Sequence, residues 1–371
     1  MFASFGLIKP LLRALEKENH QLPTPVQQAA IPFLLAGRDL IGFAQTGTGK
    51  TATFLLPLLQ RLAKNKHSGH IMRALILVPT RELAQQTGNA VYQYGRYLSV
   101  SHAVIYGGVS ILEQIDILKG EIDLLVATPG RLSELLNRGA LSLEKIEMLV
   151  LDESDRMLDM GFIREIRRIL SCLPEKRQSV LFSATMTPEI SLLAESFLRN
   201  PETVIISPTS SAASLVCQQL YRIEKSQKDL LLNRLLNLPE MESVIIFVNT
   251  RKSADVLFKK LKRMDFKVDY LHSDRKQSVR DRVLDEFRKQ RYPILIATDV
   301  AARGIDVDHV THVINYELPY QPEIYVHRIG RTGRAGKNGT AISLCCKEDR
   351  KIVTQIERLT GQVIDERSFP V

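Results

Sequence analysis

The sequence predicts an α/β protein with two domains, each built around a mainly parallel sheet flanked by helices. Three observations support this prediction. Short apolar runs rich in β-branched residues alternate with helix-like segments along the chain, which is the pattern of βαβ units. The length of 371 residues is about that of two ordinary domains. A small and polar stretch without apolar periodicity interrupts the alternation at 207–214.

The strand candidates form two sets. In the first part of the chain they span 39–44, 74–78, 102–106, 123–127, 148–151, 179–182 and 204–206, and in the second part 218–223, 243–248, 267–271, 293–297, 310–315 and 340–344. Helical patterns lie between most of them, for example at 251–264 and 276–288, and the crossovers should be right-handed.

The polar stretch marks the expected domain boundary. We predict an N-terminal domain at 1–206, a short flexible linker at 207–217 and a C-terminal domain at 218–371. The alternative is a long surface loop inside a single domain. Two such domains on a short linker would form a cleft, where ligands often bind.

Composition excludes several classes of protein. Apolar residues make up 44% and charged residues 25%, which rules out global disorder. No apolar run approaches the ~18 residues of a membrane span, and the first residues lack the pattern of a secretory signal. The four cysteines show neither zinc nor disulfide spacing. Reduced thiols in a cytoplasmic protein are therefore expected.

The charge points to a polyanion partner without deciding the question. The formal net charge is +9 and the pI is near 9.3. Most of the excess lies after the boundary, with net +7 from Pro208 onward and +2 before it. Nucleic acid would suit this balance. A solvated basic surface without a partner explains the charge equally well.

A phosphate-binding loop follows the first strand candidate. The residues are Ala44, Gln45, Thr46, Gly47, Thr48, Gly49, Lys50 and Thr51, close to the pattern G-x-x-x-x-G-K-[ST] with alanine for the first glycine. Glycines let backbone N–H groups surround phosphate oxygens at a helix N-terminus. Lys50 would reach the β- and γ-phosphates, and the Thr51 hydroxyl would ligate Mg²⁺. The alternative, a Gly/Thr-rich turn, does not explain the flanking strand and helix.

An acidic cluster, Asp152-Glu153-Ser154-Asp155, follows a later strand candidate. In enzymes with a phosphate-binding loop, such a strand end presents the carboxylate on the Mg²⁺ side. Asp152 would hold Mg²⁺ and Glu153 would orient or deprotonate the attacking water, which suits hydrolysis. An acidic helix cap is the alternative. The phosphate-binding loop favours the nucleotide interpretation.

With these residues and several further motifs, the chain resembles a DEAD-box RNA helicase core of two tandem RecA-like domains. Asp152-Glu153-Ser154-Asp155 is similar to the DEAD box and Pro23-Thr24-Pro25-Val26-Gln27 to the Q motif, with Phe5 upstream. Further matches are Pro79–Leu83, Gly107-Gly108, Thr128–Arg131, Ser183-Ala184-Thr185, Ile246–Thr250, Gln277–Arg280, Ala301–Asp306 and His327–Arg334. The segment from Arg156 to Phe162 resembles the bacterial RhlE-type branch most.

The resemblance implies roles at the nucleotide. Gln27 would bond the adenine edge, Phe5 and His20 would support that pocket, and Asp306 would bond the ribose. Arg331 and Arg334 would reach the γ-phosphate from the second domain, with Arg334 as the arginine finger. Asp155 and Ser183 would hydrogen-bond to each other, and with Thr185, His327 and Arg328 would couple the nucleotide state to RNA. ATP and Mg²⁺ are the implied cofactors.

The resemblance also implies contacts to the RNA backbone of a single strand or short duplex. The matching residues are Arg81, Gly108, Thr128, Gly130 and Arg131 in the first domain and Asn249, Thr250, Arg251, Thr298 and Gly304 in the second. Such groups suit phosphates and 2′-hydroxyls, so binding should be largely independent of sequence and sensitive to salt. The pathway stays open among ribosome assembly, mRNA decay and cold adaptation, and the oligomeric state cannot be predicted.

The chain departs from the family pattern at several positions. Ser154 replaces an alanine, and its hydroxyl could disturb Asp155. His20 replaces an aromatic residue and covers less of the adenine, which favours weaker ATP binding. Ser273 replaces a glycine near the RNA. The basic tails of many relatives are not found in the sequence, which ends at Val371.

Two other functions are weighed against an RNA helicase. A DNA-directed translocase of the same superfamily is disfavoured by the Q motif and by the Thr128–Arg131 stretch. A scaffold that closes on RNA with ATP but hydrolyses it poorly is kept open by Ser154 and His20.

Overall fold

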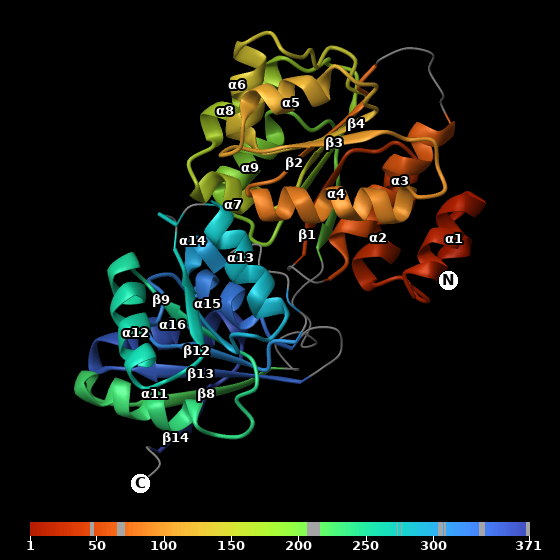
Figure 1. Ribbon diagram of the computed structural model, residues 1–371. Helices are drawn as coiled ribbons and strands as arrows, with labels where there is room; N and C mark the ends of the chain where they lie inside the picture. The colour runs from red at the N-terminus through yellow and green to blue at the C-terminus, as the bar shows by residue number, and fades with distance from the viewer. Residues whose placement is uncertain are drawn as a thin grey trace. The chain divides into compact units, whose positions relative to one another are not determined.

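The computed structural model describes residues 1–44, 48–64, 71–205, 216–272, 274–275, 277–302, 307, 309–333 and 338–368. The chain divides into two compact units, Met1–Ser207 and Pro208–Val371 (Figure 1). Most of the predicted linker, 207–215, lies outside the described residues, and its last two residues, Val216 and Cys217, belong to a strand.

The first unit holds a seven-stranded sheet in the order β3-β4-β2-β5-β6-β1-β7, with every pair parallel. Its strands are β1 (Leu40–Phe43), β2 (Ala74–Leu77), β3 (His102–Ile105), β4 (Leu124–Ala127), β5 (Met148–Leu151), β6 (Gln178–Ser183) and β7 (Glu202–Ile205). Its helices are η1 (Phe2–Phe5), α1 (Lys9–Lys17), α2 (Pro25–Leu35), α3 (Lys50–Lys64), α4 (Arg81–Gly95), α5 (Ile111–Leu118), α6 (Pro129–Asn137), α7 (Ser154–Asp159), α8 (Ile163–Ser171) and α9 (Pro188–Glu195).

Both faces of this sheet are buried under helices. Ala74 and Ile76 of β2 join a core with residues of α1 to α4, while Leu75 and Leu77 join a second core with residues of α6 to α9. Successive side chains of a strand point to opposite faces. A strand covered on both faces is therefore continuously apolar, as β2 is.

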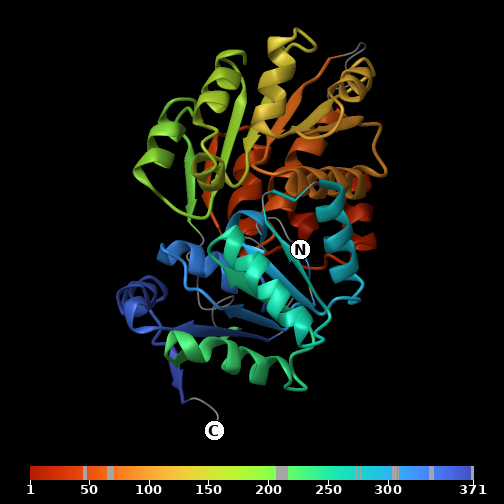
Figure 2. The same ribbon diagram turned by 60° about the vertical axis from the view of Figure 1, so that its left-hand side comes forward.

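The second unit repeats this architecture, with the strand order β10-β11-β9-β12-β13-β8-β14 and parallel pairing throughout. Its strands are β8 (Val216–Arg222), β9 (Val244–Val248), β10 (Val268–Leu271), β11 (Ile294–Thr298), β12 (His312–Asn315), β13 (Gly339–Cys345) and β14 (Asp365–Arg367). Its helices are η2 (Lys225–Gln227), α11 (Lys228–Leu236), α12 (Arg251–Arg263), α13 (Gln277–Arg288), α14 (Asp299–Ala302), α15 (Pro322–Ile329), η3 (Lys347–Asp349) and α16 (Arg350–Thr360). Figure 2 shows α11 and α16 on opposite faces of this sheet.

The predicted α/β class with two parallel sheets is confirmed, and each strand candidate contains or overlaps an observed strand. Strand β14 was not predicted. Its three residues are charged and exposed, so it carries none of the β-branched or aromatic pattern on which a strand prediction depends. Among the described residues, no helix is both long and apolar enough to cross a membrane.

One partly buried ion pair connects the amino ends of three strands in the first unit. The Asp123 carboxylate accepts hydrogen bonds from the Ser101 backbone N–H at 3.0 Å, the Ser101 hydroxyl at 3.1 Å and the Arg73 guanidinium at 3.0 Å. Burial alone would raise the pKa of Asp123, but the bonds from Ser101 and Arg73 outweigh it and the pKa is lowered. The carboxylate is thus stabilised in its charged form, and Arg73 is only 3% exposed.

Replacing Asp123 should therefore destabilise the first unit. We expect Asp123→Asn to lower its free energy of unfolding by about 1–3 kcal/mol at pH 7, because Arg73 stays buried with a weaker acceptor. A lowered pKa contributes stability above the ordinary value of 3.8 and loses it as the pH falls. Urea unfolding at pH 7 and at pH 3 should show the difference from the wild type shrinking at pH 3.

Asp116→Asn is the matched control, because Asp116 pairs with Lys119 on the surface, where both side chains are over 70% exposed. We expect a change below about 0.5 kcal/mol. An equal effect of the two substitutions would contradict the role assigned to Asp123.

Candidate functional site

In the first unit the hydrogen-bond ladder of the sheet continues one residue past the strand ends. The backbone N–H groups of four residues donate to the neighbouring strand: Thr128 to Ile105 at 3.1 Å, Val78 to Ala127 at 3.0 Å, Asp152 to Leu77 at 3.0 Å and Ala44 to Ser183 at 3.1 Å. Since all strands are parallel, these residues share the carboxyl edge of the sheet. That edge is where open α/β sheets bind ligands.

The strand order sorts the predicted site residues along this edge. Arg81, Gly108 and Thr128 follow β2, β3 and β4, which are adjacent at one end of the sheet. The Asp152 and Ala44 segments follow β5 and β1. Strand β6 lies between β5 and β1. The residues predicted for RNA and those predicted for the nucleotide thus occupy neighbouring stretches of a single edge.

The described part of the phosphate-binding loop is held from within the protein. Lys50, the first residue of α3, is 6% exposed, and its Nζ donates to the Ala44 carbonyl at 2.9 Å. Gly49 has φ +92°, and a Cβ there would lie 2.6 Å from Nε2 of Gln27. Glycine is therefore needed both for the backbone conformation and for the close approach. The predicted phosphate ligands Gln45, Thr46 and Gly47 lie outside the described residues, while Thr48 and Thr51 are half-buried.

Gln27 joins this loop to the Q motif. Its Oε1 accepts from the Thr24 N–H at 2.9 Å, which completes a capping box at the start of α2, and its Nε2 donates to the Gly49 carbonyl at 3.1 Å. The side chain is 5% exposed. Gln27 thus braces the loop, a function that the sequence reasoning did not foresee.

The two aromatic positions predicted at the adenine are placed differently from each other. Phe5 is half-buried and packs edge-on against Phe2 in the first core. His20 is exposed, and its Nε2 forms a 3.0 Å hydrogen bond with the Tyr94 hydroxyl. Burial, with the nearby Glu18 charge, raises the pKa of Tyr94 to about 12, so the phenol stays protonated.

The two carboxylates of the acidic cluster differ sharply in environment. Asp152 is 3% exposed, and burial raises its pKa to about 6 against the opposing charge of Lys50. Glu153 has a left-handed backbone with φ 52°, which is unfavourable for a residue with a long side chain. Its carboxylate pairs with Arg156 at 2.7 Å. A buried acid and a strained neighbour are typical of a catalytic site.

These residues fit a Mg²⁺ ion that is bound together with phosphate. Within the described ranges, no group of three or more His, Cys, Asp or Glu side chains could hold a metal by itself. Mg²⁺ at phosphate sites normally uses one or two protein oxygens, with phosphate and water completing its shell. The Asp152 carboxylate and the Thr51 hydroxyl supply such a set, and a cation there would offset the desolvation that raises the pKa of Asp152.

The predicted direct hydrogen bond between Asp155 and Ser183 is not formed. Asp155 Oδ2 instead accepts from the Ala184 N–H at 3.1 Å and from the Thr185 hydroxyl at 3.4 Å. The Ser183 hydroxyl donates to the Thr185 carbonyl at 2.7 Å, a local acceptor that serine commonly finds at a strand end. The two residues are therefore connected through Thr185.

Ser154 does not disturb this network. Its side chain is fully buried, and its hydroxyl donates back to the Leu151 carbonyl at 3.4 Å. The departure from alanine is accommodated inside the first turn of α7.

The predicted RNA residues of the first unit form two groups. Arg81 lies directly against Gly108, where a Cβ would fall only 1.6 Å from the Arg81 guanidinium and where φ is +80°. Gly130, in α6, is half-buried. Arg131 is 7% exposed and donates to the Gln114 amide at 2.7 Å and to the Val109 carbonyl at 3.0 Å. Arg131 thus turns inward and fixes the loop that carries Gly108.

In the second unit, Arg328 organises the carboxyl edge of the sheet. The guanidinium is 1% exposed and pairs with both carboxylate oxygens of Asp299, at 2.6 and 2.8 Å. It also donates to Asn249 Oδ1 at 2.8 Å and to the Glu317 carbonyl at 2.6 Å. All partners of Arg328 among the described residues belong to this unit. Its predicted part in coupling to Asp155 therefore stays a prediction.

The Asn249 loop is equally constrained. The Asn249 N–H donates to the Glu317 carboxylate at 2.6 Å, and its amide donates to the Leu318 carbonyl at 2.8 Å. The Thr250 hydroxyl caps α12 by accepting from the Ser253 N–H at 3.0 Å. Glu317 was missed by the sequence reasoning, although an acid two residues after a buried strand repeats the pattern of Glu153.

The remaining predicted residues of the second unit are placed in part. Arg251 is exposed and pairs with Asp274, and Thr298, at the end of β11, is 6% exposed. Arg331 is 7% exposed and donates to the His327 carbonyl at 3.3 Å. Gly304, Asp306, Arg334 and Ser273 lie outside the described residues.

Comparison with protein families agrees with this geometry. Residues 24–193 match the model of the DEAD/DEAH box helicases, and residues 227–336 match the helicase conserved C-terminal domain. The chain belongs to the DEAD-box helicase family. The predicted membership of this family is confirmed, and one match lies in each of the two units described above.

Known DEAD-box helicases resemble the chain over nearly its full length. The ATP-dependent RNA helicase CshA of Limosilactobacillus reuteri is 41% identical over 97% of this chain and 72% of its own. CshA of Bacillus cereus is 40% identical over 100% of this chain and 70% of its own. The structure of S. cerevisiae Dbp5 bound to RNA and ADP BeF3 superposes with a TM-score of 0.87 at 34% identity, covering 99% of this chain and 95% of that one.

The contacts of Gln27 lead to a prediction about stability that can be tested without a nucleotide. Gln27→Ala removes the acceptor for the Thr24 N–H and the donor to Gly49, so we expect the free energy of unfolding of the first unit to fall by about 1–2 kcal/mol. Gln28→Ala is the control, because Gln28 is exposed and its side-chain amide donates to the Pro23 carbonyl. Urea unfolding of both variants tests this, and an equally small change in both would remove the bracing role of Gln27.

Proposed function

We propose that this DEAD-box family member is an ATP-dependent RNA helicase that hydrolyses ATP when RNA is bound and opens short duplexes locally. One observation carries the proposal. The buried pair Lys50 and Asp152, the strained Glu153 and the Arg81–Gly108 contact all belong to loops at the carboxyl edge of one sheet. ATP and RNA would therefore be bound by adjacent loops.

The protein groups at the nucleotide have separate tasks. Lys50 neutralises phosphate charge, and the N-terminus of α3 adds its backbone N–H groups and its dipole. Asp152 and Thr51 would hold a Mg²⁺ ion, which when bound would supply positive charge to the phosphates. Glu153 accepts a proton from the attacking water. Arg331 and Arg334 stabilise the transferred phosphoryl group, and Asp306 and Gln27 select the nucleoside.

The protein would bind the RNA through the sugar–phosphate backbone of the RNA. Arg81, Gly108, Thr128 and Gly130 in the first unit, with Thr250, Arg251, Thr298 and Gly304 in the second, supply a charge, hydroxyls and N–H groups to phosphates and 2′-hydroxyls. Arg131 and Asn249 act differently, because their side chains are committed to internal hydrogen bonds. They hold the loops that contact RNA.

Hydrolysis would be coupled to RNA by closure of the two units around both ligands. The Asp155–Thr185–Ser183 connection joins the acidic cluster to the end of β6, and His327 and Arg328 belong to α15 of the second unit. Closure would bring Arg331 and Arg334 to the phosphate, bend one RNA strand and open the duplex. Phosphate release would then free the RNA.

The finer assignments are part of this proposal. The RhlE-type branch is supported by the segment from Arg156 to Phe162, whereas the relatives described above are named CshA. A cytoplasmic location is supported by the cysteine pattern. Ribosomal or mRNA-decay complexes are proposed partners. Cold adaptation is a further setting, because contacts to the RNA backbone do not select one RNA sequence.

The experiment that tests this function is steady-state phosphate release from ATP by the whole chain. It is measured without nucleic acid, with single-stranded RNA and with DNA of the same sequence. We expect at least tenfold stimulation by RNA and little by DNA.

Two other results would each overturn a part of the proposal. Equal stimulation by DNA would indicate a DNA-directed translocase. ATP-dependent RNA binding without phosphate release would indicate a clamp, and the Ser154→Ala variant would then show whether the altered box is the cause.

Glu153 gives the sharpest single substitution. Glu153→Gln keeps the size of the side chain but removes the base, so we expect RNA-stimulated hydrolysis to fall at least about 100-fold while ATP still binds. Glu175→Gln, on a carboxylate that is 94% exposed, should leave the rate unchanged. Retained hydrolysis in the Glu153 variant would refute the catalytic assignment.

A further inference from the structure

The two sheets share one strand order, so each functional loop of the first unit has a counterpart in the second. Aligning the orders pairs β1 with β8, β6 with β13 and β5 with β12. The ladder bonds agree with this alignment. The Ala44 N–H donates to the last residue of β6, and the Ile223 N–H donates to Cys345, the last residue of β13, at 3.0 Å. The segment after β8 is therefore the counterpart of the phosphate-binding loop.

Lysines occupy corresponding places in the two units. Lys50 begins α3, the helix after β1, and Lys228 begins α11, the helix after β8. Lys228 is 7% exposed, and its Nζ donates to the Tyr316 carbonyl at 2.7 Å. Tyr316 directly follows β12, as Asp152 directly follows β5. The second unit thus keeps a buried lysine at the position that serves phosphate in the first.

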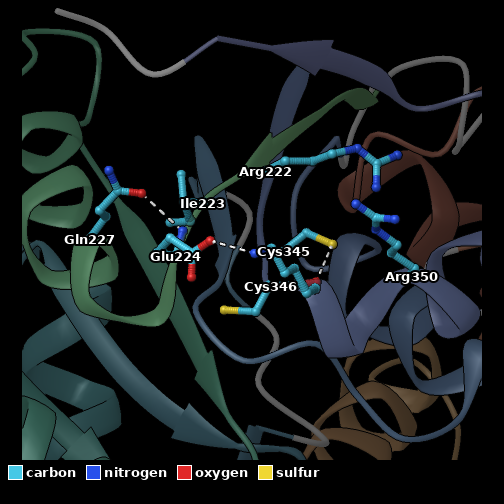
Figure 3. Close-up of a pocket in the computed structure, with 8 residues that line it drawn as sticks. Arg222, Ile223, Glu224, Gln227, Cys345, Cys346 and Arg350 are labelled. Atoms are coloured by element: carbon cyan, nitrogen blue, oxygen red, sulfur yellow. Dashed lines mark hydrogen bonds and ion pairs between the residues drawn. The ribbon is translucent and has the colours of Figure 1, made fainter.

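A pocket of about 280 Å³ lies at this counterpart position, at the carboxyl ends of β8 and β13 (Figure 3). It is lined by Arg222, Ile223, Glu224, Gln227, Cys345, Cys346, Lys347 and Arg350. The segment from Ile223 to Gln227 contains no glycine, so it cannot wrap around a triphosphate as a glycine-rich loop does. The volume is also below the usual range for drug-sized ligands. Any ligand must be small.

The charges of the pocket favour an anion. Three basic side chains line it against one acidic side chain. Figure 3 shows the Arg222 and Arg350 guanidinium groups extending to the same side of the pocket. Arg222 pairs with Glu366 only at the surface, where both side chains are about half exposed, and such pairs are weak. Among the described residues, the Arg350 guanidinium has no hydrogen-bond or ion-pair partner.

The helix that carries Arg350 adds a second argument. Arg350 begins α16, whose first turn contains no acidic residue. The N-cap residue Asp349 is acidic, but its Oδ2 accepts from the Cys346 N–H at 2.8 Å. An anion placed at a helix N-terminus is stabilised by the dipole and by free N–H groups. A bound anion would therefore add to the charge compensation that Asp349 provides.

From this geometry we propose that the second unit binds a small phosphate anion, such as inorganic phosphate or pyrophosphate, between Arg222 and Arg350. Gln227 adds an amide donor, and Lys347, which pairs with Glu224 at the surface at 3.2 Å, adds a third positive charge. This site lies at the second unit's counterpart of the nucleotide site and is separate from the ATP and RNA residues assigned above.

The test is calorimetric titration of the full chain with pyrophosphate. The Lys50→Ala variant is used as background, to weaken binding at the ATP site. We expect one site to remain in this background. Adding Arg350→Ala should weaken it at least about tenfold, because one charge-assisted hydrogen bond to phosphate is lost, and adding Arg222→Ala as well should abolish it.

Arg358→Ala is the matched control, since Arg358 is an exposed arginine two turns further along α16. It should leave the affinity unchanged. Amide hydrogen exchange locates the site, and pyrophosphate should protect the segments 223–227 and 346–350 in the Lys50→Ala background only while Arg350 is present. No binding in the Lys50→Ala background, or equal binding with and without Arg350, would overturn the proposal.

Discussion

Four functional loops of the first unit begin with a hydrogen bond that still belongs to the sheet. Thr128, Val78, Asp152 and Ala44 each donate to the strand beside them. In a parallel sheet the hydrogen bonds between strands are evenly spaced, and the carboxyl ends of all strands lie at the same edge. The sheet thereby fixes the first residue of each loop, while the glycines and hydroxyl residues that follow can adapt to a ligand. Loops of this kind, with a fixed first residue and adaptable later residues, are suited to positioning phosphates.

Buried guanidinium groups extend this rigidity into the loops. Arg131 and Arg328 are 7% and 1% exposed, and each donates hydrogen bonds to carbonyl, amide or carboxylate oxygens of other segments. A buried charge is tolerated only when it is paired and hydrogen-bonded. Losing a partner would leave that charge unsatisfied, so the loops that these arginines join are strongly held. A buried, hydrogen-bonded arginine therefore holds loops in place in each of the two units.

The sequence predicted the parts of the molecule that local patterns determine. Continuous apolar runs such as 74–78 belong to strands buried on both faces, and their periodicity is visible within a few residues. The phosphate-binding loop and the acidic cluster are equally local. Strand β14 was missed because its three residues are all charged and exposed, so no apolar pattern marks it.

Side-chain orientation could not be predicted in the same way, because it depends on partners far along the chain. Arg131 turns inward toward Gln114 and Val109, which lie 17 and 22 residues away. Asn249 is held by Glu317 across 68 residues. Ser183 finds its acceptor two residues away, in a turn whose shape the sequence does not reveal.

The left-handed backbone at Glu153 has a consequence for how this protein can change. Glycine would adopt φ 52° without strain, and the strain of a larger residue there is of order 1 kcal/mol. The carboxylate of Glu153 offsets this cost, because it pairs with the buried Arg156 at 2.7 Å. A variant with glycine at this position would relieve the backbone but leave the Arg156 charge without that partner, so the same side chain serves both hydrolysis and the stability of the first turn of α7.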